Sequence, residues 1–212
     1  MHALQECVQY LSRLVADPEG DHEARSKMCL ASSSAGTGFG NAGVHLCHGM
    51  SYAVSSQVKT FWTDGYSQDR DEEDAHGLVA HGLSVSINAP AVFRFTGKPQ
   101  ESGDDHLRQH IIERHAVCAR ILAEARVERQ GGSVPSDFAM RSEPGEALAA
   151  ELLELMSELD VPLGIRNLGY SEDDVDSLAR GTLPQERVTL LSPRQPVELE
   201  DLKELFSNAL EY

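Results

Sequence analysis

The chain has 212 residues and a formal net charge of −16. This acidic excess argues against nucleic acid and anionic membrane as partners, because both require basic patches on the protein. The four cysteines show no C-x-x-C spacing, which is typical of reduced thiols in an intracellular compartment. No apolar run approaches the roughly 20 residues needed to span a bilayer, and the N-terminus shows no signal peptide and no Arg-rich transit segment.

Apolar residues recur at helical spacing along most of the chain, and strand patterns are nearly absent. The best short strand candidate is residues 187–191, and it is a poor one. The sequence therefore predicts an all-α helical bundle that forms a single domain over residues 1–212. The predicted helices cover residues 1–16, 22–35, 44–60, 81–95, 107–128, a segment starting at 142–146, 171–180 and 198–210.

Glycine and proline mark the predicted breaks between these helices. A glycine-rich turn is expected at residues 36–43, and Pro90 should kink or end the helix in which it falls. Ser171 opens a capping box, and Gly181 is a candidate C-cap. Flexible loops are predicted at about residues 63–80, 97–106 and 129–142.

Two His-Gly pairs stand near the starts of predicted helices, at His48 and His81. Neutral imidazole is a common ligand for iron and zinc, and a following glycine lets a ligand or a backbone come close. Two imidazoles that meet across a helix–helix contact would begin a metal site. Two histidines alone do not complete one, and the alternative is a pair of hydrogen-bonded histidines in a helical core.

Other residues could complete or line such a site. His45 lies one turn before His48 and is either a ligand or, as we favour, a wall residue. Asp74 or His76 could complete a zinc site, although both fall in a polar segment that reads more simply as a solvated loop. Cys47 is interpreted as a packing residue.

Seven short segments carry a resemblance to a known family. Residues 38–52 form a glycine-rich run that contains His45 and His48, and residues 81–85 contain the second His-Gly pair. They closely resemble the metal-site segments of the iron-containing alcohol dehydrogenases, best of all in the hydroxyacid–oxoacid transhydrogenase branch. The remaining matching segments, in the same order as in the family, are residues 89–93, 169–171, 181–189, 192–194 and 200–202.

The resemblance implies a fold like the C-terminal domain of dehydroquinate synthase-like proteins and iron-containing alcohol dehydrogenases. It also implies one metal ion, usually iron(II), held by an aspartate and three histidines, of which the last two fall by motif on His48 and His81. Tyr52 stands near the nicotinamide position, where many bacterial relatives have a further histidine. His45 and Tyr52 are therefore candidates for lining the substrate or nicotinamide side. Ala80 replaces a proline that usually precedes the second His-Gly pair.

The family also has an N-terminal nucleotide-binding domain with a glycine-rich phosphate loop. Residues 36–41 do not follow a strand-like run and open no βαβ unit, so they are not that loop. The family's aspartate and first histidine would fall ahead of Met1. We therefore expect the C-terminal helical half alone, lacking two metal ligands and inactive by itself.

The activity that the resemblance implies is hydride transfer, with iron(II) or zinc and a bound NAD as cofactors. It couples oxidation of 4-hydroxybutyrate to succinate semialdehyde with reduction of 2-oxoglutarate to 2-hydroxyglutarate. These substrates are carboxylates, so a cationic anchor is expected; Arg187 and Lys59 are candidates, although most single surface cations are only solvated. The implied location is mitochondrial, and otherwise cytoplasmic. The expected partners are a second copy of the chain or the missing N-terminal domain.

A second hypothesis comes from a different class of protein. With half the ligands and no nucleotide domain, the chain could be a non-catalytic helical domain, either a stable remnant or an interaction subunit. Metal retention distinguishes the two hypotheses, because two histidines alone should hold iron(II) weakly and exchangeably.

Overall fold

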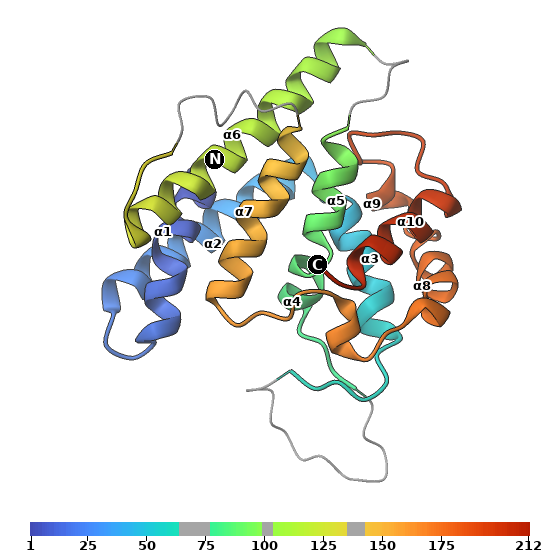
Figure 1. The fold of residues 1–212 in the computed structure, drawn as a ribbon, viewed down its shortest axis with the longest axis horizontal. Helices are drawn as coiled ribbons and strands as arrows, with labels where there is room; N and C mark the ends of the chain where they lie inside the picture. The colour runs from blue at the N-terminus through green and yellow to red at the C-terminus, as the bar shows by residue number, and fades with distance from the viewer. Residues whose placement is uncertain (64–76, 99–103, 135–142) are drawn as a thin grey trace. The chain divides into compact units, whose positions relative to one another are not determined.

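The computed structural model describes residues 1–63, 77–98, 104–134 and 143–212 (Figure 1). Over these ranges the chain is helical, and apart from an isolated bridge between Trp62 and Leu78 it forms no strand. The predicted all-α fold is therefore confirmed. Among the described residues no helix is long and apolar enough to cross a membrane.

Several predictions fall on residues that the structure does not describe. Asp74 and His76 lie outside the described residues, so the alternative zinc site cannot be placed. The same holds for large parts of the predicted loops at 63–80, 97–106 and 129–142.

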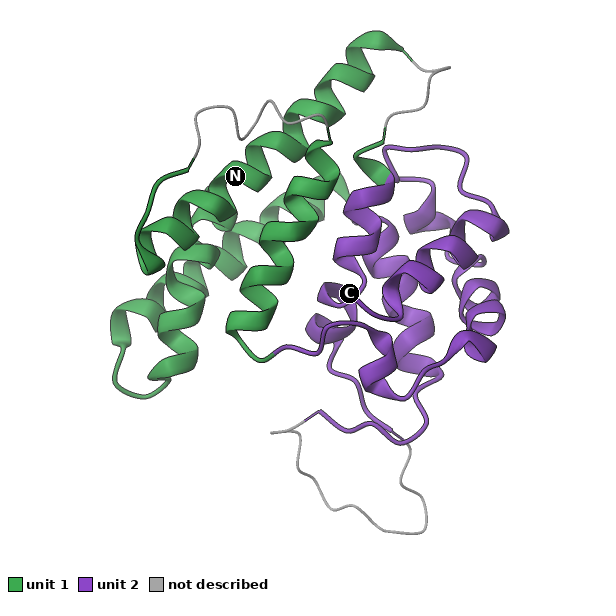
Figure 2. Cartoon of the chain, in the orientation of Figure 1, with its two compact units in different colours: residues 1–43, 96–160 green, residues 44–95, 161–212 purple. Residues whose placement is uncertain are grey.

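The chain divides into two compact units, each built from two stretches of sequence (Figure 2). Unit 1 joins residues 1–43 to 96–160, and unit 2 joins residues 44–95 to 161–212. A single domain over the whole chain stays a prediction from the sequence. Both candidate ligands, His48 and His81, lie in unit 2.

The described residues of unit 1 form four helices, in which α1 packs on α2 and α6, and α6 packs on α7. Their bounds are α1 His2–Ala16, α2 His22–Ala42, α6 Asp105–Gln130 and α7 Pro144–Glu158. Along α6, Ile111, Ile121 and Leu122 are buried, whereas Val117 is exposed.

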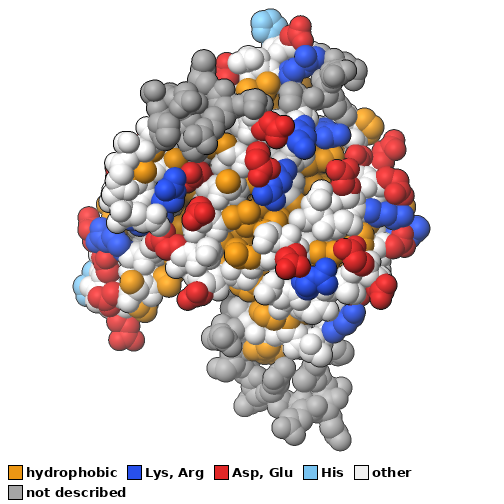
Figure 3. All heavy atoms as spheres, viewed as in Figure 1, with side chains coloured by type: hydrophobic (Ala, Val, Ile, Leu, Met, Phe, Trp, Pro, Cys, Tyr) orange, Lys and Arg blue, Asp and Glu red, His pale blue; other side chains and the backbone are white. Residues whose placement is uncertain are grey.

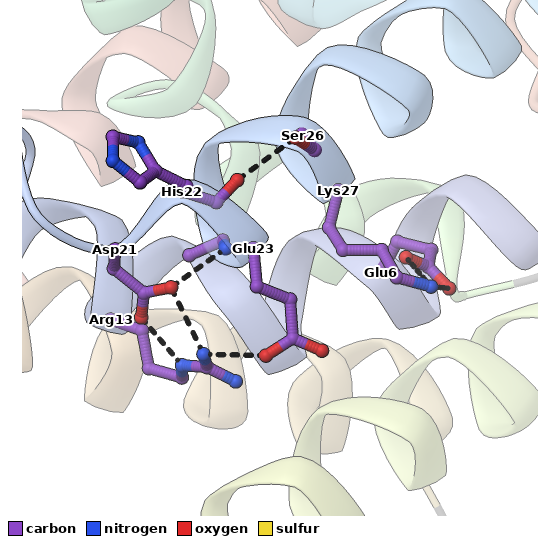
Figure 4. Close-up of polar contacts among 8 residues, drawn as sticks. Glu6, Arg13, Asp21, His22, Glu23, Ser26 and Lys27 are labelled. Carbon is purple, nitrogen blue, oxygen red and sulfur yellow. Dashed lines mark hydrogen bonds and ion pairs between the residues drawn. The ribbon is translucent and has the colours of Figure 1, made fainter.

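Arg13 joins the start of α2 to α1 (Figure 4). Its Nε and Nη2 donate to the two carboxylate oxygens of Asp21 at 2.9 and 3.0 Å, and Nη2 also donates to Glu23 at 2.8 Å. Asp21 in turn caps α2 by accepting the Ala24 N–H at 2.9 Å. The guanidinium beside it lowers the pKa of the Asp21 carboxyl, so the cap stays ionised at neutral pH.

The predicted turn at residues 36–43 is wrong, because α2 continues to Ala42. Thr37 Oγ1 donates to the Ser33 carbonyl at 3.1 Å and Asn41 Nδ2 donates to the Thr37 carbonyl at 2.8 Å, so polar side chains bond back onto the helix. The helix ends only at Gly43, where φ reaches +78° and the N–H donates to Phe39 at 2.7 Å. Glycine tolerates the helix interior at a cost of roughly 1 kcal/mol, whereas the positive φ at its end favours glycine.

Unit 2 is organised around α3, on which α4, α8 and α9 pack, and α10 packs on α8. Three side chains of α3, those of Leu46, Met50 and Val54, are fully buried. The elements are α3 Leu46–Ser56, α4 His81–Ser86, α5 Ala89–Thr96, the 3-10 helices η2 Ile165–Leu168 and η3 Glu172–Asp174, α8 Val175–Thr182, α9 Glu186–Thr189 and α10 Leu199–Ala209.

Three helix predictions for unit 2 are corrected, and the strand candidate that the sequence analysis doubted is helical. The single helix expected over 81–95 is two helices, and Pro90 lies in the first turn of α5, where its missing N–H costs little. Gly181 is inside α8 rather than at its C-cap. The weak strand candidate at 187–191 falls largely in α9. The helix predicted over 44–60 is shorter than expected, since α3 ends at Ser56.

One face of the molecule is visibly mixed in charge. On the face shown in Figure 3, lysine and arginine side chains stand among aspartates and glutamates rather than in a continuous basic patch.

Candidate metal centre

The first ligand candidate, His48, lies in the first turn of α3. His45 is the N-cap of this helix, and its carbonyl accepts the backbone N–H of His48 at 2.9 Å and of Gly49 at 3.0 Å. Because the buried face of α3 is anchored by Leu46 and Met50, the helix cannot rotate without exposing them. The side chain of His48 is half-buried on a helix that is fixed in place.

The second candidate, His81, is the first residue of α4. Two hydrogen bonds pair the chain before it: Thr63 N–H donates to Leu78 at 2.9 Å, and Leu78 N–H donates to Phe61 at 2.7 Å. The Thr63 hydroxyl also donates to the Leu78 carbonyl at 3.1 Å and accepts the Ala80 N–H at 2.9 Å. The backbone is therefore held up to the residue that precedes His81.

A side-chain hydrogen bond joins the two ligand helices directly. Ser55 Oγ of α3 donates to Ser84 Oγ of α4 at 3.0 Å, and Ser84 Oγ donates to the His81 carbonyl at 2.8 Å. Ser84 is fully buried, so this link is shielded from water. Neither serine stood out in the sequence, because serines at helical spacing are common and carry no distinctive motif.

These contacts bring the two imidazoles together. The ring centroids of His48 and His81, hereafter the imidazole pair, are 5.4 Å apart with an angle of 60° between the ring planes. Two imidazoles that bind one ion through nitrogen–metal distances of about 2.0–2.1 Å place their centroids roughly 5–6 Å apart. The spacing therefore suits two ligands of a single ion.

The electrostatics of the pair favour the form that binds metal. Burial lowers the pKa of His48 below its usual range, and the neighbouring His81 lowers it further. A lowered pKa keeps the His48 ring neutral at physiological pH, with a lone pair available. Metal binding requires this neutral form.

The described residues do not complete the ligand set. Within them, no group of three or more His, Cys, Asp or Glu side chains could hold a metal ion. His45 is half-buried at the start of α3, in agreement with either of its two predicted roles. Burial raises the pKa of the Cys47 thiol to about 12, so Cys47 remains protonated, as expected of a packing residue.

Tyr52 lies against the imidazole pair, one helical turn beyond His48. Its ring stacks on His81 with centroids 6.1 Å apart and an angle of 18° between the planes. The guanidinium carbon of Arg187, on α9, lies 5.7 Å from the centroid of the Tyr52 ring. Lys59, the other cationic candidate, forms an ion pair with Asp174 at 2.7 Å.

The glycine after each histidine has a different environment. A Cβ atom added at Gly49 would lie 3.3 Å from Val188 Cγ2 and 3.5 Å from Thr189 Cγ2, so α9 packs closely on α3 at this point. A Cβ added at Gly82 would meet nothing within 4 Å. Side-chain methyl groups therefore approach the glycine beside His48, and nothing approaches the glycine beside His81.

Comparison with known proteins shows which class of protein has this fold. Residues 1–63 match the model of the Fe-containing alcohol dehydrogenase family, C-terminal. A crystal structure of 1,3-propanediol oxidoreductase superposes with a TM-score of 0.69 at 19% identity, covering 99% of this chain and 44% of that one. An alcohol dehydrogenase from Oenococcus oeni superposes with a TM-score of 0.64 at 20% identity, covering 98% and 43%. The chain is thus related to the C-terminal helical part of the iron-containing alcohol dehydrogenases.

Within that class, the similar curated proteins are transhydrogenases. The mitochondrial hydroxyacid-oxoacid transhydrogenase of Mus musculus is 47% identical over 210 residues, which are 99% of this chain and 39% of that protein. The human protein of the same name is 44% identical, with the same coverage. A probable mitochondrial hydroxyacid-oxoacid transhydrogenase from Dictyostelium discoideum is 40% identical, over 99% of this chain and 33% of that protein. The predicted resemblance is confirmed, and the chain spans about two fifths of these relatives. The roles of individual residues stay predictions.

Proposed function

We propose that this chain is the metal-binding part of a hydroxyacid–oxoacid transhydrogenase, with His48 and His81 as two ligands of one iron(II) ion. The observation that carries the proposal is the 5.4 Å separation of the two rings, which come from separate segments that both resemble the family's metal site. The similarity to transhydrogenases over 99% of this chain supports the same reaction.

The proposed reaction oxidises 4-hydroxybutyrate to succinate semialdehyde and reduces 2-oxoglutarate to 2-hydroxyglutarate, with a bound nicotinamide as the hydride carrier. Iron, or zinc in its place, would supply Lewis-acid chemistry at the oxygen that loses or gains the proton. The chain's own residues bind and orient. His48 and His81 hold the ion, Tyr52 fixes the plane of the His81 ring by stacking, and the Ser55–Ser84 bond fixes the distance between their helices.

In this proposal, the remaining metal ligands and the nucleotide site lie outside the described residues of this chain. The described residues offer two ligands, so the other ligands and the nucleotide site would be supplied by an N-terminal domain or by a second copy of the chain. The proposed location is mitochondrial, in line with the names of the relatives. The alternative remains a non-catalytic remnant or interaction subunit.

A chimera tests the proposal. In the Mus musculus transhydrogenase, the region that matches this chain is replaced by residues 1–212, and formation of 2-hydroxyglutarate from 4-hydroxybutyrate and 2-oxoglutarate is followed by mass spectrometry. We expect activity that is lost in His48→Ala and His81→Ala. A folded chimera that binds iron but shows no turnover would favour the non-catalytic alternative.

A further inference from the structure

The described lysines and arginines of unit 2 fall into two groups. Four of them are engaged with carboxylates, in the ion pairs Lys59–Asp174, Arg166–Glu211, Arg180–Asp176 and Lys203–Glu200. Three lie over aromatic rings, namely Arg94 over Tyr212, Arg194 over Phe95 and Arg187 over Tyr52. Among these three aromatic residues, Tyr52 is the one whose ring stacks on His81.

We propose that Arg187 binds the carboxylate of the hydroxyacid or oxoacid substrate, an inference that rests on the proposed function. Its guanidinium is exposed, and among the described residues it forms no ion pair with an acidic side chain. Arginine presents a planar fork of N–H donors that matches the two oxygens of a carboxylate. The Tyr52 face beneath it restricts the plane of that fork, since a guanidinium is attracted to an aromatic face.

The backbone of Arg187 is held against the helix that carries His48. Its neighbours Val188 and Thr189 are buried, with exposed fractions of 3% and 8%. Both lie close to Gly49, the residue after His48. Gln195 Nε2 also donates to the Thr189 carbonyl at 2.6 Å, which holds the end of α9. The spacing between the cation and the imidazole pair is therefore set by packed structure rather than by a free loop.

The proposed metal ligands and Arg187 offer partners for the two ends of the substrate, its hydroxyl and its carboxylate. A hydroxyl at one end of 4-hydroxybutyrate suits the metal ligands, and the carboxylate at its other end suits Arg187. The ring of Tyr52 contacts both ends of this arrangement, since it stacks on His81 and lies against the Arg187 guanidinium. A local cation also matters because the chain carries a net charge of −16, which repels anionic substrates. Arg187 would thus select hydroxyacids over neutral alcohols.

The test uses the full 212-residue chain, without metal and again with iron(II), and follows arginine side-chain Nε–H resonances by NMR. The probes are 4-hydroxybutyrate and 1,4-butanediol, which has a hydroxymethyl group in place of the carboxylate. Arg187→Lys assigns the Arg187 signal. We expect a saturable shift of that signal with 4-hydroxybutyrate and an affinity at least about tenfold weaker for the diol. By calorimetric titration with the same two probes, Arg187→Gln should abolish the preference, and Arg187→Lys should retain part of it.

The control is Arg180, an exposed arginine of unit 2 that pairs with Asp176 at 2.7 Å. Its signal should move little, and Arg180→Gln should leave carboxylate binding unchanged. The inference is overturned if Arg187 responds equally to the diol, responds no more than Arg180, or does not respond. Iron binding is measured separately on the same samples, so loss of the metal site and loss of the carboxylate site are distinguishable.

Discussion

At the scale of single residues, the motif identified the histidines and the structure gives their surroundings. The two His-Gly pairs are visible in the sequence, and they led to the prediction that His48 and His81 meet across a helix contact. The contact of Tyr52 with His81 was not predictable from spacing, because the two residues lie in separate helices and their stacking depends on tertiary packing. The sequence also could not predict which cation lies over Tyr52. Arg187 and Lys59 were equal candidates in the sequence, and the structure distinguishes them by their partners.

The stacking makes a prediction about Tyr52. Tyr52→Phe keeps the ring against His81, whereas Tyr52→Leu removes it. Since aromatic pairs contribute about 0.5–1.5 kcal/mol, we expect Tyr52→Leu to weaken metal binding about two- to tenfold, with Tyr52→Phe close to the wild-type chain. Titration with iron(II) under anaerobic conditions measures this. Equal losses in both variants would show that the hydroxyl, rather than the ring, is the important group.

Asp174 should make stability dependent on pH. Its carboxylate accepts hydrogen bonds from Lys59 at 2.7 Å and from the Ser171 backbone N–H at 2.9 Å. These donors, Lys59 first, lower its pKa below the ordinary value of 3.8. A carboxyl with a depressed folded-state pKa stabilises the fold above its unfolded-state pKa, and this contribution is lost as the pH falls through the folded-state pKa.

Asp174→Asn should therefore lower the free energy of unfolding at pH 7 by about 1–2 kcal/mol. The difference from the wild-type chain should shrink as the pH falls below about 4. Urea unfolding at a series of pH values measures both quantities. A difference that stays constant down to pH 2 would mean that the ionised form of Asp174 is not what stabilises the fold.

At the scale of elements, helix existence was predictable and several helix ends were not. The apolar periodicity of α1, α7 and α10 matched the structure closely, because amphipathic helices carry their own signal. The glycine-rich segment was wrongly predicted as a turn, since glycine lowers helix propensity without preventing a helix and residues 36–42 continue α2. The short helix α9 was missed because it is held by its packing on α3 rather than by its own periodicity.

The two glycines after the ligand histidines should respond in opposite ways to alanine. Gly49→Ala puts a methyl group against buried Val188 and Thr182, and overpacking costs about 1–3 kcal/mol, more than the roughly 1 kcal/mol gained in helix propensity. We expect a net loss of stability. Gly82→Ala enters open space and should stabilise the chain by about 0.5–1 kcal/mol.

Thermal and urea unfolding of both variants measure these changes. If Gly49→Ala is as stable as Gly82→Ala, α9 can shift away from α3 at little cost. The packing would then not fix the position of Arg187.

At the scale of the whole molecule, the described residues bring two imidazoles together and place a tyrosine and an arginine beside them. Unit 2 provides a pair of adjacent imidazoles, a stacked tyrosine and an exposed arginine, and the similar transhydrogenases are more than twice as long as this chain. Two imidazoles should bind iron(II) weakly and exchangeably, whereas a complete ligand set would bind it firmly. The central claim is therefore that His48 and His81 bind one ion together.

That claim is tested most directly by anaerobic calorimetric titration of the chain with iron(II). The variants are His48→Ala, His81→Ala and His45→Ala. The control is His110→Ala, because His106 and His110 lie one turn apart on α6 and could bind metal independently. We predict one weak site whose affinity falls about tenfold or more in His48→Ala and in His81→Ala, and is unchanged in His110→Ala. Unchanged binding in either His48→Ala or His81→Ala would contradict the proposed metal centre.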